Sequence, residues 1–372
     1  MKFAIWDKLQ PRAGVSHTQL YHEHLQEVSI AEKCGFDHFW FFEHHVSPNS
    51  PIPSPNLMVA AASVMTSRIR LGNMVNVLPY RDPLLVAEEA AMLDVLSGGR
   101  LDVGVGRGLK PTEFEVFCLS QADSRAMFEE SIEVIRRIWA DETFEHRGTH
   151  YSVAKKTPLS PPLVQRPTPR LWISAQSEES LRWAAERDLM FGQIDSLIED
   201  CRRDCERYHE IQAAAGHGFA QRLFLTREVY VAETDEKARA EAYEYLLADW
   251  DLWNRYKQFA RDGRLPAGYE AWAKRAPLLS SLSFEDLIEQ GVVLVGSPAT
   301  VAEGIRRHQE QLELAVLVCV MQLAHMPHEM VRKSMEMFAA EVMPHFTDPA
   351  AGERGHVPAG AGEGGTGAHA FG

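Results

Sequence analysis

The 372-residue chain is long enough to bury a large core, and α/β barrels of this size are commonly single domains. Its formal net charge of −14, with no long basic block, argues against a nucleic-acid groove or a binding face for an anionic membrane. Five scattered cysteines without a CxxC pair, a start too polar for a signal peptide and the lack of any run near the roughly 18 apolar residues of a membrane span predict a cytoplasmic protein.

Apolar segments of strand length alternate along the chain with segments of helical periodicity. The first pair sets the pattern, because residues 2–7 predict a strand and residues 17–34 predict a helix that ends at Gly35. The expected strands span residues 2–7, 37–42, 69–78, 100–105, 171–174, 189–192, 223–232 and 315–321. The expected helices span residues 17–34, 56–66, 83–96, 124–140, 177–187, 195–214, 299–312 and 328–341. About eight strands separated by helices predict parallel βαβ units and an α/β fold of the (β/α)8 TIM-barrel type.

Three segments depart from this alternation. Residues 143–153 predict a hairpin. Residues 235 to about 290 combine a long helix with a stretch containing Gly and Pro, which predicts a helical insertion late in the chain. From residue 347 onward the chain is rich in Gly and Ala. We therefore expect a barrel domain over residues 1–346 and a disordered tail over residues 347–372.

One polar cluster follows an aromatic strand. The carboxyl ends of barrel strands meet at one mouth, where TIM-barrel active sites lie. The strand expected at residues 37–42 is followed directly by Glu43, His44 and His45. Because side chains alternate along a strand, we expect one histidine to face the mouth and the other to pack outside it. A histidine that is merely packed and hydrogen-bonded is the alternative. Other polar residues expected near strand ends are Asp7, Asn76 and Ser174.

A second cluster predicts phosphate binding. Arg107 follows an expected strand and lies between Gly106 and Gly108, which leave the backbone open around a fork-shaped guanidinium. The glycine spacing is not that of a GxGxxG dinucleotide fingerprint, and a structural ion pair is the alternative role for the arginine. Ser177 and Ser180 leave another strand and enter a helix, where hydroxyl groups and free amides bind anions. An ordinary N-cap explains Ser177 alone, but together with Arg107 it suggests one bound phosphate.

A metal site is an alternative for the histidine-rich stretch. Barrel hydrolases typically carry a His-x-His pair on the first strand, where this chain offers only Asp7. His22 and His24 lie on the first expected helix, in positions for packing or solvent exposure. We therefore expect no metal.

Several ordered motifs make the chain resemble the bacterial luciferase-like, flavin-dependent monooxygenase family over about residues 1–345. These motifs are Phe41-Phe42-Glu43-His44-His45, Leu78-Pro79-Tyr80-Arg81-Asp82-Pro83, Ser97-Gly98-Gly99-Arg100, Gly104-Val105-Gly106-Arg107-Gly108 and Ser180-Leu181-Arg182-Trp183-Ala184-Ala185. The resemblance implies a TIM barrel that binds reduced FMN at its mouth and reacts it with molecular oxygen to a C4a-hydroperoxide. It also implies a separate NAD(P)H:flavin reductase that supplies the reduced FMN, and a homodimer packed through the helices after the second and third strands.

The resemblance assigns roles position by position. His44 matches the catalytic histidine of the family, and Arg107 matches the arginine that binds the FMN phosphate. A non-prolyl cis peptide under the flavin ring is implied between Met74 and Val75. The full set of expected cofactor contacts is Met74, Val75, Asn76, Arg107, Gln176, Ser177 and Ser180. The residues expected to line the mouth near the substrate are Asp7, Glu43 and His45.

Two positions depart from the family pattern. Gly106 stands where bacterial luciferases carry a cysteine, and Gln176 replaces a glutamate before the phosphate-binding serine. Both departures argue against light emission, and neither touches the oxygenase chemistry.

The expected function is that of a two-component, FMNH2-dependent monooxygenase acting on a small, apolar or moderately polar organic molecule. Oxygen chemistry on a flavin requires that water is excluded, which suits the aromatic strand and a closing flap near residues 262–290. Three alternatives remain open: a deazaflavin-dependent oxidoreductase that transfers hydride, a non-catalytic flavin-binding protein, and a metal hydrolase.

Overall fold

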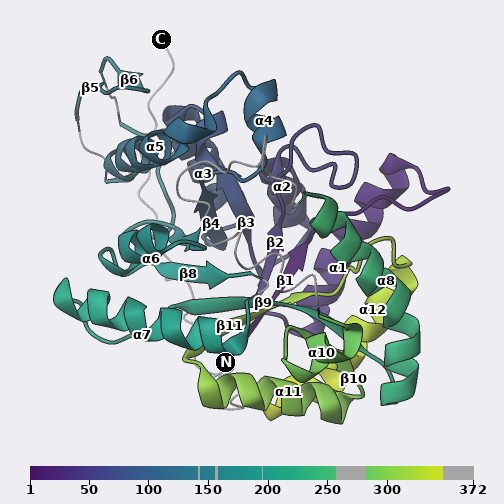
Figure 1. Cartoon of the computed structure of the whole chain (residues 1–372). Coiled ribbons are helices and arrows are strands. Elements are labelled where there is room, and N and C mark those ends of the chain that lie inside the picture. The colour runs from purple at the N-terminus through teal and green to yellow at the C-terminus, as the bar shows by residue number, and fades with distance from the viewer. Residues whose placement is uncertain (141–142, 156–157, 195, 257–281, 347–372) are drawn as a thin grey trace, which may run out of the picture.

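Eight parallel strands close into a barrel in the computed structural model, and helices form a ring around it (Figure 1). The structure describes residues 1–140, 143–155, 158–194, 196–256 and 282–346. Within these residues the barrel strands are β1 (Lys2–Asp7), β2 (His38–Phe41), β3 (Arg70–Val77), β4 (Leu101–Gly106), β7 (Arg170–Ser174), β8 (Met190–Gln193), β9 (Leu223–Val231) and β11 (Leu314–Val320). They pair in this order, and β11 pairs with β1 to close the barrel. The predicted (β/α)8 TIM barrel is confirmed.

Helices follow most barrel strands, and local sequence signals set their ends. The helices are α1 (His17–Cys34), α2 (Pro55–Met65), α3 (Pro83–Leu96), α4 (Pro111–Val116), α5 (Ser124–Trp139), α6 (Glu178–Ala185), α7 (Ile198–Ala214), α8 (Asp235–Tyr256), α10 (Phe284–Glu289), α11 (Pro298–Gln311) and α12 (His328–Met337). Ser16 caps α1 by accepting a hydrogen bond from the Gln19 amide, and Gly35 ends this helix in a left-handed conformation. Asp82 caps α3, with Pro83 at the first helical position.

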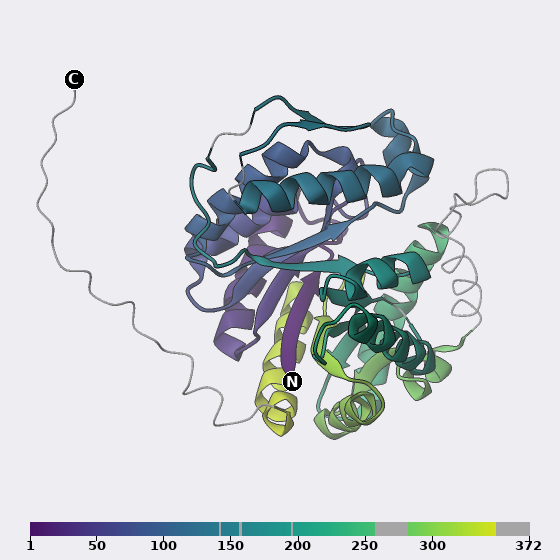
Figure 2. The ribbon, with the colours of Figure 1, turned by 90° about the vertical axis from the view of Figure 1, so that its left-hand side faces the viewer.

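The last helical segments complete the ring beside the first strand. After α12, the chain continues as a π-helical turn over Phe338–Val342 and a 3-10 turn over Met343–His345. The Phe338 ring packs edge-on against Phe3 of β1, with centroids 5.3 Å apart. Figure 2 shows β1 beside α12, so segments from opposite ends of the described chain lie side by side.

Alternation along the strands sorts side chains between the barrel interior and the helical layer. In β1, Trp6 packs in the inner cluster, whereas Ile5 joins the larger core beneath the helices. The inner cluster also holds Trp40 and Trp172, whose ring centroids lie 3.6 Å apart. Gly104 makes room for these rings, because a Cβ at this position would lie 2.9 Å from the indole nitrogen of Trp172. The barrel is therefore a filled core and not a pore.

The structure contains a strand and a helix that the sequence pattern did not reveal. β10 (Val293–Gly296) pairs in parallel with the last residues of β9, from Glu228 to Val231. It is only four residues long and stands directly before the cap of α11, so it gave no separate strand signal. α4 has six residues, too few for helical periodicity to be recognised.

The segments that depart from the barrel pattern are described in part. The predicted hairpin is confirmed, because β5 (His146–Arg147) pairs antiparallel with β6 (Ser152–Val153). In the predicted insertion, α8 packs against β9 and β10. Residues 257–281, which include most of the expected flap, and the predicted tail over residues 347–372 lie outside the described residues. The division into barrel domain, insertion and tail stays a prediction.

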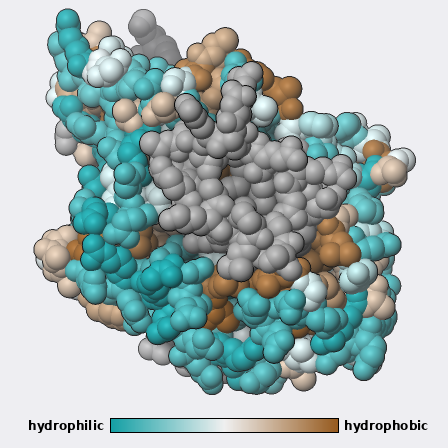
Figure 3. All heavy atoms as spheres, viewed as in Figure 1, coloured by the Kyte–Doolittle hydropathy of each residue, from teal (hydrophilic) through white to brown (hydrophobic). Residues whose placement is uncertain are grey.

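The outer surface is mainly polar on the face that carries α7 and α11, where Figure 3 shows hydrophilic residues over most of the described area. Both helices bury one side and expose charged side chains on the other, as an amphipathic surface helix does. Among the helices that the structure describes, none combines the length and the apolar character needed to cross a membrane.

Candidate active site

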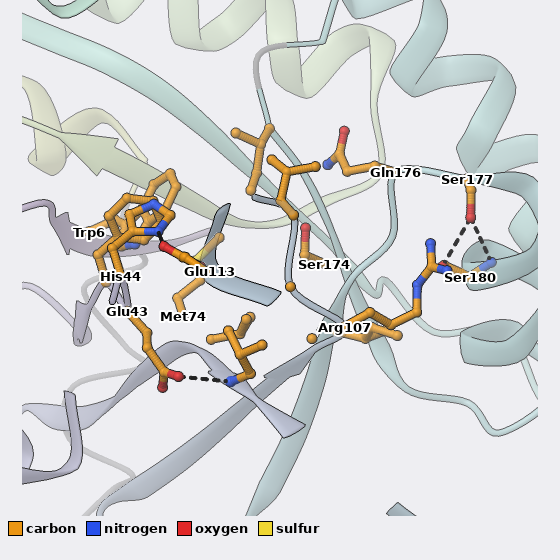
Figure 4. Close-up of a pocket in the computed structure, with 18 residues that line it drawn as sticks. Trp6, Glu43, His44, Met74, Arg107, Glu113, Ser174, Gln176, Ser177 and Ser180 are labelled. Carbon is orange, nitrogen blue, oxygen red and sulfur yellow. Dashed lines mark hydrogen bonds and ion pairs between the residues drawn. The ribbon is translucent and has the colours of Figure 1, made fainter. Parts of the chain in front are cut away.

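A pocket opens at the carboxyl ends of the barrel strands (Figure 4). It encloses about 1170 Å³, including the part that is open to solvent. Much of its wall is apolar, with Trp6 from β1, Phe42 after β2, Ile173 from β7 and Ile194 after β8. The pocket therefore lies where TIM-barrel enzymes carry their active sites, and several strands contribute to it.

His44 and Glu113 form a buried pair in the pocket wall. The loop after β2 supplies His44, and its Nδ1 lies 2.7 Å from Oε1 of Glu113, which the first turn of α4 supplies. Both residues line the pocket, and Figure 4 shows them directed toward one another. The sequence reasoning missed Glu113, because it stands 69 residues from His44 on a helix too short to recognise. A carboxylate that binds one ring nitrogen orients the imidazole and defines its tautomer.

The pKa values of the pair favour a neutral imidazole beside a carboxylate. Burial lowers the pKa of His44, although the hydrogen bond to Glu113 opposes this effect. Burial opposes ionisation of Glu113, but the hydrogen bond from His44 outweighs it with the help of neighbouring charges, so the pKa of Glu113 is lowered. At neutral pH, Nδ1 therefore carries the proton donated to Glu113, and Nε2 is the ring nitrogen that can accept one.

The neighbouring residues Glu43 and His45 belong to a separate ion-pair network. His45 Nε2 lies 3.0 Å from Glu43 Oε1, and Arg81 approaches the other carboxylate oxygen at 3.4 Å. The His45 ring packs edge-on against Tyr80. Glu43 lines the pocket, whereas His45 does not. The structure places His44 on the pocket side and His45 away from it, as expected. Both histidines follow the end of β2 at Phe41, however, so the loop and not strand alternation sets their directions.

Hydroxyl and guanidinium groups gather at the other end of the pocket. Arg107 follows β4, and Ser177 caps the start of α6 by accepting a hydrogen bond from the Ser180 amide. The two serine hydroxyl groups lie 3.1 Å apart, and Figure 4 shows Arg107 extending toward them. All three residues line the pocket. The first turn of an eight-residue helix, two hydroxyl groups and a guanidinium form a suitable site for a phosphate.

Arg125 adds a second guanidinium that the sequence reasoning missed. It lies in the first turn of α5, and its terminal nitrogen donates a hydrogen bond of 3.2 Å to Oγ of Ser180. The same side chain forms ion pairs with Glu129 and Glu179. No local motif marks this arginine, because only the packing of α5 beside α6 brings it to Ser180.

The middle of the pocket is built around β3 and β4. The peptide bond between Met74 and Val75 is cis, as the resemblance implied, and both residues line the pocket. A Cβ at Gly106 would lie 2.5 Å from Cγ2 of Val75, so glycine at this position lets the two strands approach. Gln176 also lines the pocket and donates a hydrogen bond of 3.3 Å to the Gly192 carbonyl.

The structure places Asp7 and Asn76 outside the pocket lining. Trp6 faces the pocket, so Asp7, the next residue on β1, points toward the helical layer. There, Oδ1 of Asp7 lies 2.7 Å from Nδ1 of His24 on α1. Asn76 is buried on β3 beside Val105 of β4. A position at a strand end was therefore not enough to predict that Asp7 and Asn76 line the pocket, because the direction of a side chain decides whether it reaches the barrel mouth.

Asp7, His24 and Glu27 are close enough to offer three ligand atoms to a metal ion. Nδ1 of His24 already lies 2.7 Å from Asp7, and Glu27 lies 2.8 Å from Nδ1 of His328. Asp7 is thus paired with His24, and Glu27 is paired with His328. A buried hydrogen-bonded network accounts for this cluster.

The sequence pattern of the luciferase-like monooxygenases matches residues 1–312. The 4-hydroxyprotoasukamycin monooxygenase of Streptomyces nodosus is 30% identical over 87% of this chain and 86% of its own. The oxygenase component of the flavin-dependent trigonelline monooxygenase of Acinetobacter baylyi is 30% identical over 66% of this chain and 69% of its own. The crystal structure of monooxygenase RslO1 from Streptomyces bottropensis is 27% identical, with a TM-score of 0.79, and covers 93% of this chain and 100% of RslO1.

Two further solved structures share the barrel. The oxygenating constituent of 3,6-diketocamphane monooxygenase from Pseudomonas putida, in complex with FMN, is 24% identical with a TM-score of 0.78, covering 94% of this chain and 99% of that one. The coenzyme F420-dependent tetrahydromethanopterin reductase of Methanopyrus kandleri is 19% identical with a TM-score of 0.70, covering 93% and 99%. The fold alone thus accommodates either coenzyme. With the match over residues 1–312, the chain belongs to the luciferase-like flavin-dependent monooxygenase family.

Proposed function

We propose that this enzyme is the oxygenase component of a two-component system that uses reduced FMN and molecular oxygen to oxygenate a small organic molecule. One observation carries the proposal: a single apolar pocket has a phosphate-binding set at one end and a proton-handling histidine at the other. Arg107, Ser177 and Ser180 form the first group, and His44 with Glu113 forms the second.

The residues present fit FMN. The hydroxyl groups, the guanidinium of Arg107 and the first amides of α6 would hold its phosphate. The apolar segment around Met74 and Val75 would accept the flat face of the ring system. Reduced FMN, when bound, supplies the electrons that activate molecular oxygen. The phosphate would therefore anchor the group at one end and leave its reactive ring near His44.

The chain itself contributes proton handling and the exclusion of water. Nε2 of His44 accepts or donates a proton while Glu113 fixes the ring through Nδ1. Trp6, Phe42 and Ile194 give the remaining wall an apolar character, which keeps water from competing in the reaction. An apolar or moderately polar substrate is the class that such a wall accommodates.

A separate reductase and a second copy of the chain are the proposed protein partners. The relative from Acinetobacter baylyi is an oxygenase component, which supports supply of reduced FMN by an NAD(P)H:flavin reductase. Large apolar side chains on α2 and α3 are exposed in the single chain. On each helix they are seven residues apart, which puts them on one face of that helix. They include Leu57, Val64, Leu85 and Met92. Exposed apolar patches of this kind mark protein interfaces, and we propose a homodimer across them.

Oxygen uptake with a flavin reductase present tests the proposal. We expect oxygen consumption that rises when a suitable apolar substrate is added from a panel. Tight FMN binding without substrate-dependent uptake would instead identify a flavin-binding protein. The F420-dependent reductase with the same fold supports a second candidate, a deazaflavin-dependent oxidoreductase. Spectral titration with FMN and with F420 separates the two, and preference for F420 would contradict the proposal.

A further inference from the structure

A buried lysine lies beside the His44–Glu113 pair. Lys110 is the N-cap residue of α4, and only 4% of its surface is exposed. Lysine is rarely buried to this extent unless a partner compensates its charge. The turn that begins α4 brings its Nζ within 3.7 Å of Oε1 of Glu113. Lys110 is not among the residues that the proposed function uses to bind FMN or to transfer protons.

Three groups converge on the same oxygen of Glu113. Nδ1 of His44 lies 2.7 Å from Oε1, the backbone amide of His45 donates to it at 3.2 Å, and Nζ of Lys110 forms the ion pair at 3.7 Å. The two side chains that contact this oxygen, those of His44 and Lys110, are themselves buried. Electrostatic effects are strong in such surroundings because little water screens them.

The two charged neighbours act on His44 in opposite directions. Beyond the effect of burial, Glu113 raises the pKa of His44, whereas the positive charge of Lys110 lowers it. Burial lowers the pKa of Lys110 itself to about 8, although Glu113 opposes this change, so the lysine is charged at neutral pH. If the lysine were neutral, the carboxylate of Glu113 would act on His44 with less opposition, and the imidazole would bind a proton more readily.

We propose that Lys110 is a positioning residue that compensates the charge of Glu113 and so keeps His44 neutral and protonated at Nδ1. Its importance for turnover rests on the proposed role of His44 in proton transfer. The electrostatic effect itself does not depend on any bound group.

The other charged or titratable groups near His44 are His45, Glu43, Arg81 and Arg107. His45 has a smaller pKa-lowering effect on His44 and forms an ion pair with Glu43, which also contacts Arg81. Arg107 lines the pocket toward the phosphate end. None of these groups is altered when Lys110 alone is replaced.

Histidine NMR on the chain without added cofactor tests the inference. The signals of the 16 histidines are recorded between pH 5 and 8, and the His44 signal is identified by its loss in His44→Gln. Lys110→Met removes the charge and keeps much of the length, so we expect the pKa of His44 to rise by about one unit. Lys110→Arg keeps the charge and should leave the value close to that of the wild type. Glu113→Gln should shift the pKa of His44 in the opposite direction, downward.

A purely structural role for Lys110 predicts a different result. The inference is overturned if the pKa of His44 stays unchanged or falls in Lys110→Met, or if Lys110→Arg raises it equally. Lys110→Gln is measured in parallel, so a poorly folded methionine variant does not remove the test. FMN titration of the same variants is a separate measurement: absence of FMN binding by the wild type would contradict the proposed function and leave the His44 result unaffected.

Discussion

At the scale of single residues, the direction of each side chain decides which groups meet in the pocket. His44 lines the pocket and its neighbour His45 contacts Glu43 instead. Likewise, Trp6 faces the pocket while Asp7 contacts His24 in the helical layer. Strand alternation separates Trp6 from Asp7 on β1, whereas the loop after β2 separates His44 from His45.

His44 is the proposed central residue for turnover. Replacing it in His44→Ala removes the proton-handling group but leaves the phosphate end intact, so FMN affinity should stay near that of the wild type. Substrate-dependent oxygen uptake should fall by about 10²- to 10⁴-fold, the usual contribution of general acid–base catalysis. Stopped-flow and oxygen-electrode measurements check this, and an unchanged rate would remove His44 from the mechanism.

Site residues that carry a local sequence signal could be predicted from the sequence, and those without such a signal could not. Arg107 between glycines and Ser177 at a helix start were recognisable, and both line the pocket. Glu113 and Arg125 were not recognisable. Glu113 contacts His44, which is 69 positions away in the sequence, and Arg125 contacts Ser180, which is 55 positions away. Only the packed fold determines such contacts.

At the scale of elements, a buried histidine joins α11 to β9. Nδ1 of His308 lies 2.7 Å from the Gly304 carbonyl, and Nε of Arg227 donates to Nε2 of His308 at 3.0 Å. Burial and the charge of Arg227 lower the pKa of His308 to about 3. The histidine is thus neutral in the folded chain at every pH near neutrality.

This arrangement predicts a pH dependence of stability. The pKa of His308 is about 3 in the folded chain and about 6.5 in an unfolded one, so the unfolded chain binds the extra proton between these values. The free energy of unfolding should therefore fall as the pH drops below about 6.5, by about 1.4 kcal/mol per pH unit from this residue. Urea unfolding between pH 6.5 and 4.5 should show a shallower slope for His308→Gln, and parallel slopes would refute the assignment.

Element lengths explain which parts of the fold could be predicted. The barrel strands and long helices agree with the predicted ranges within a few residues, because apolar patterns of that length are distinct. α4 and β10, with six and four residues, were missed. The missed helix carries Glu113 and begins directly after Lys110, so a short element hid part of the site.

At the scale of the whole molecule, the exposed apolar face of α2 and α3 predicts a dimer. Val64 on α2 is 74% exposed, and a charge at this position would be buried without a partner in the proposed interface. Val64→Glu should therefore convert a homodimer into a monomer, as measured by light scattering after size exclusion.

Phe219 provides a matched control. It is 68% exposed and lies between α7 and β9, away from α2 and α3, so Phe219→Glu should leave the dimer intact. A monomeric wild type, or a Val64→Glu variant that stays dimeric, would contradict the proposed interface.

Anaerobic titration with reduced FMN tests the central claim most directly. We expect one reduced FMN per chain, and an affinity about 10- to 100-fold lower in Arg107→Ala, because a charged hydrogen bond to the phosphate is lost. Reduced riboflavin, which has no phosphate, should bind both proteins with similar affinity. Failure of the wild type to bind reduced FMN, or equal FMN affinity in the wild type and Arg107→Ala, would contradict the account.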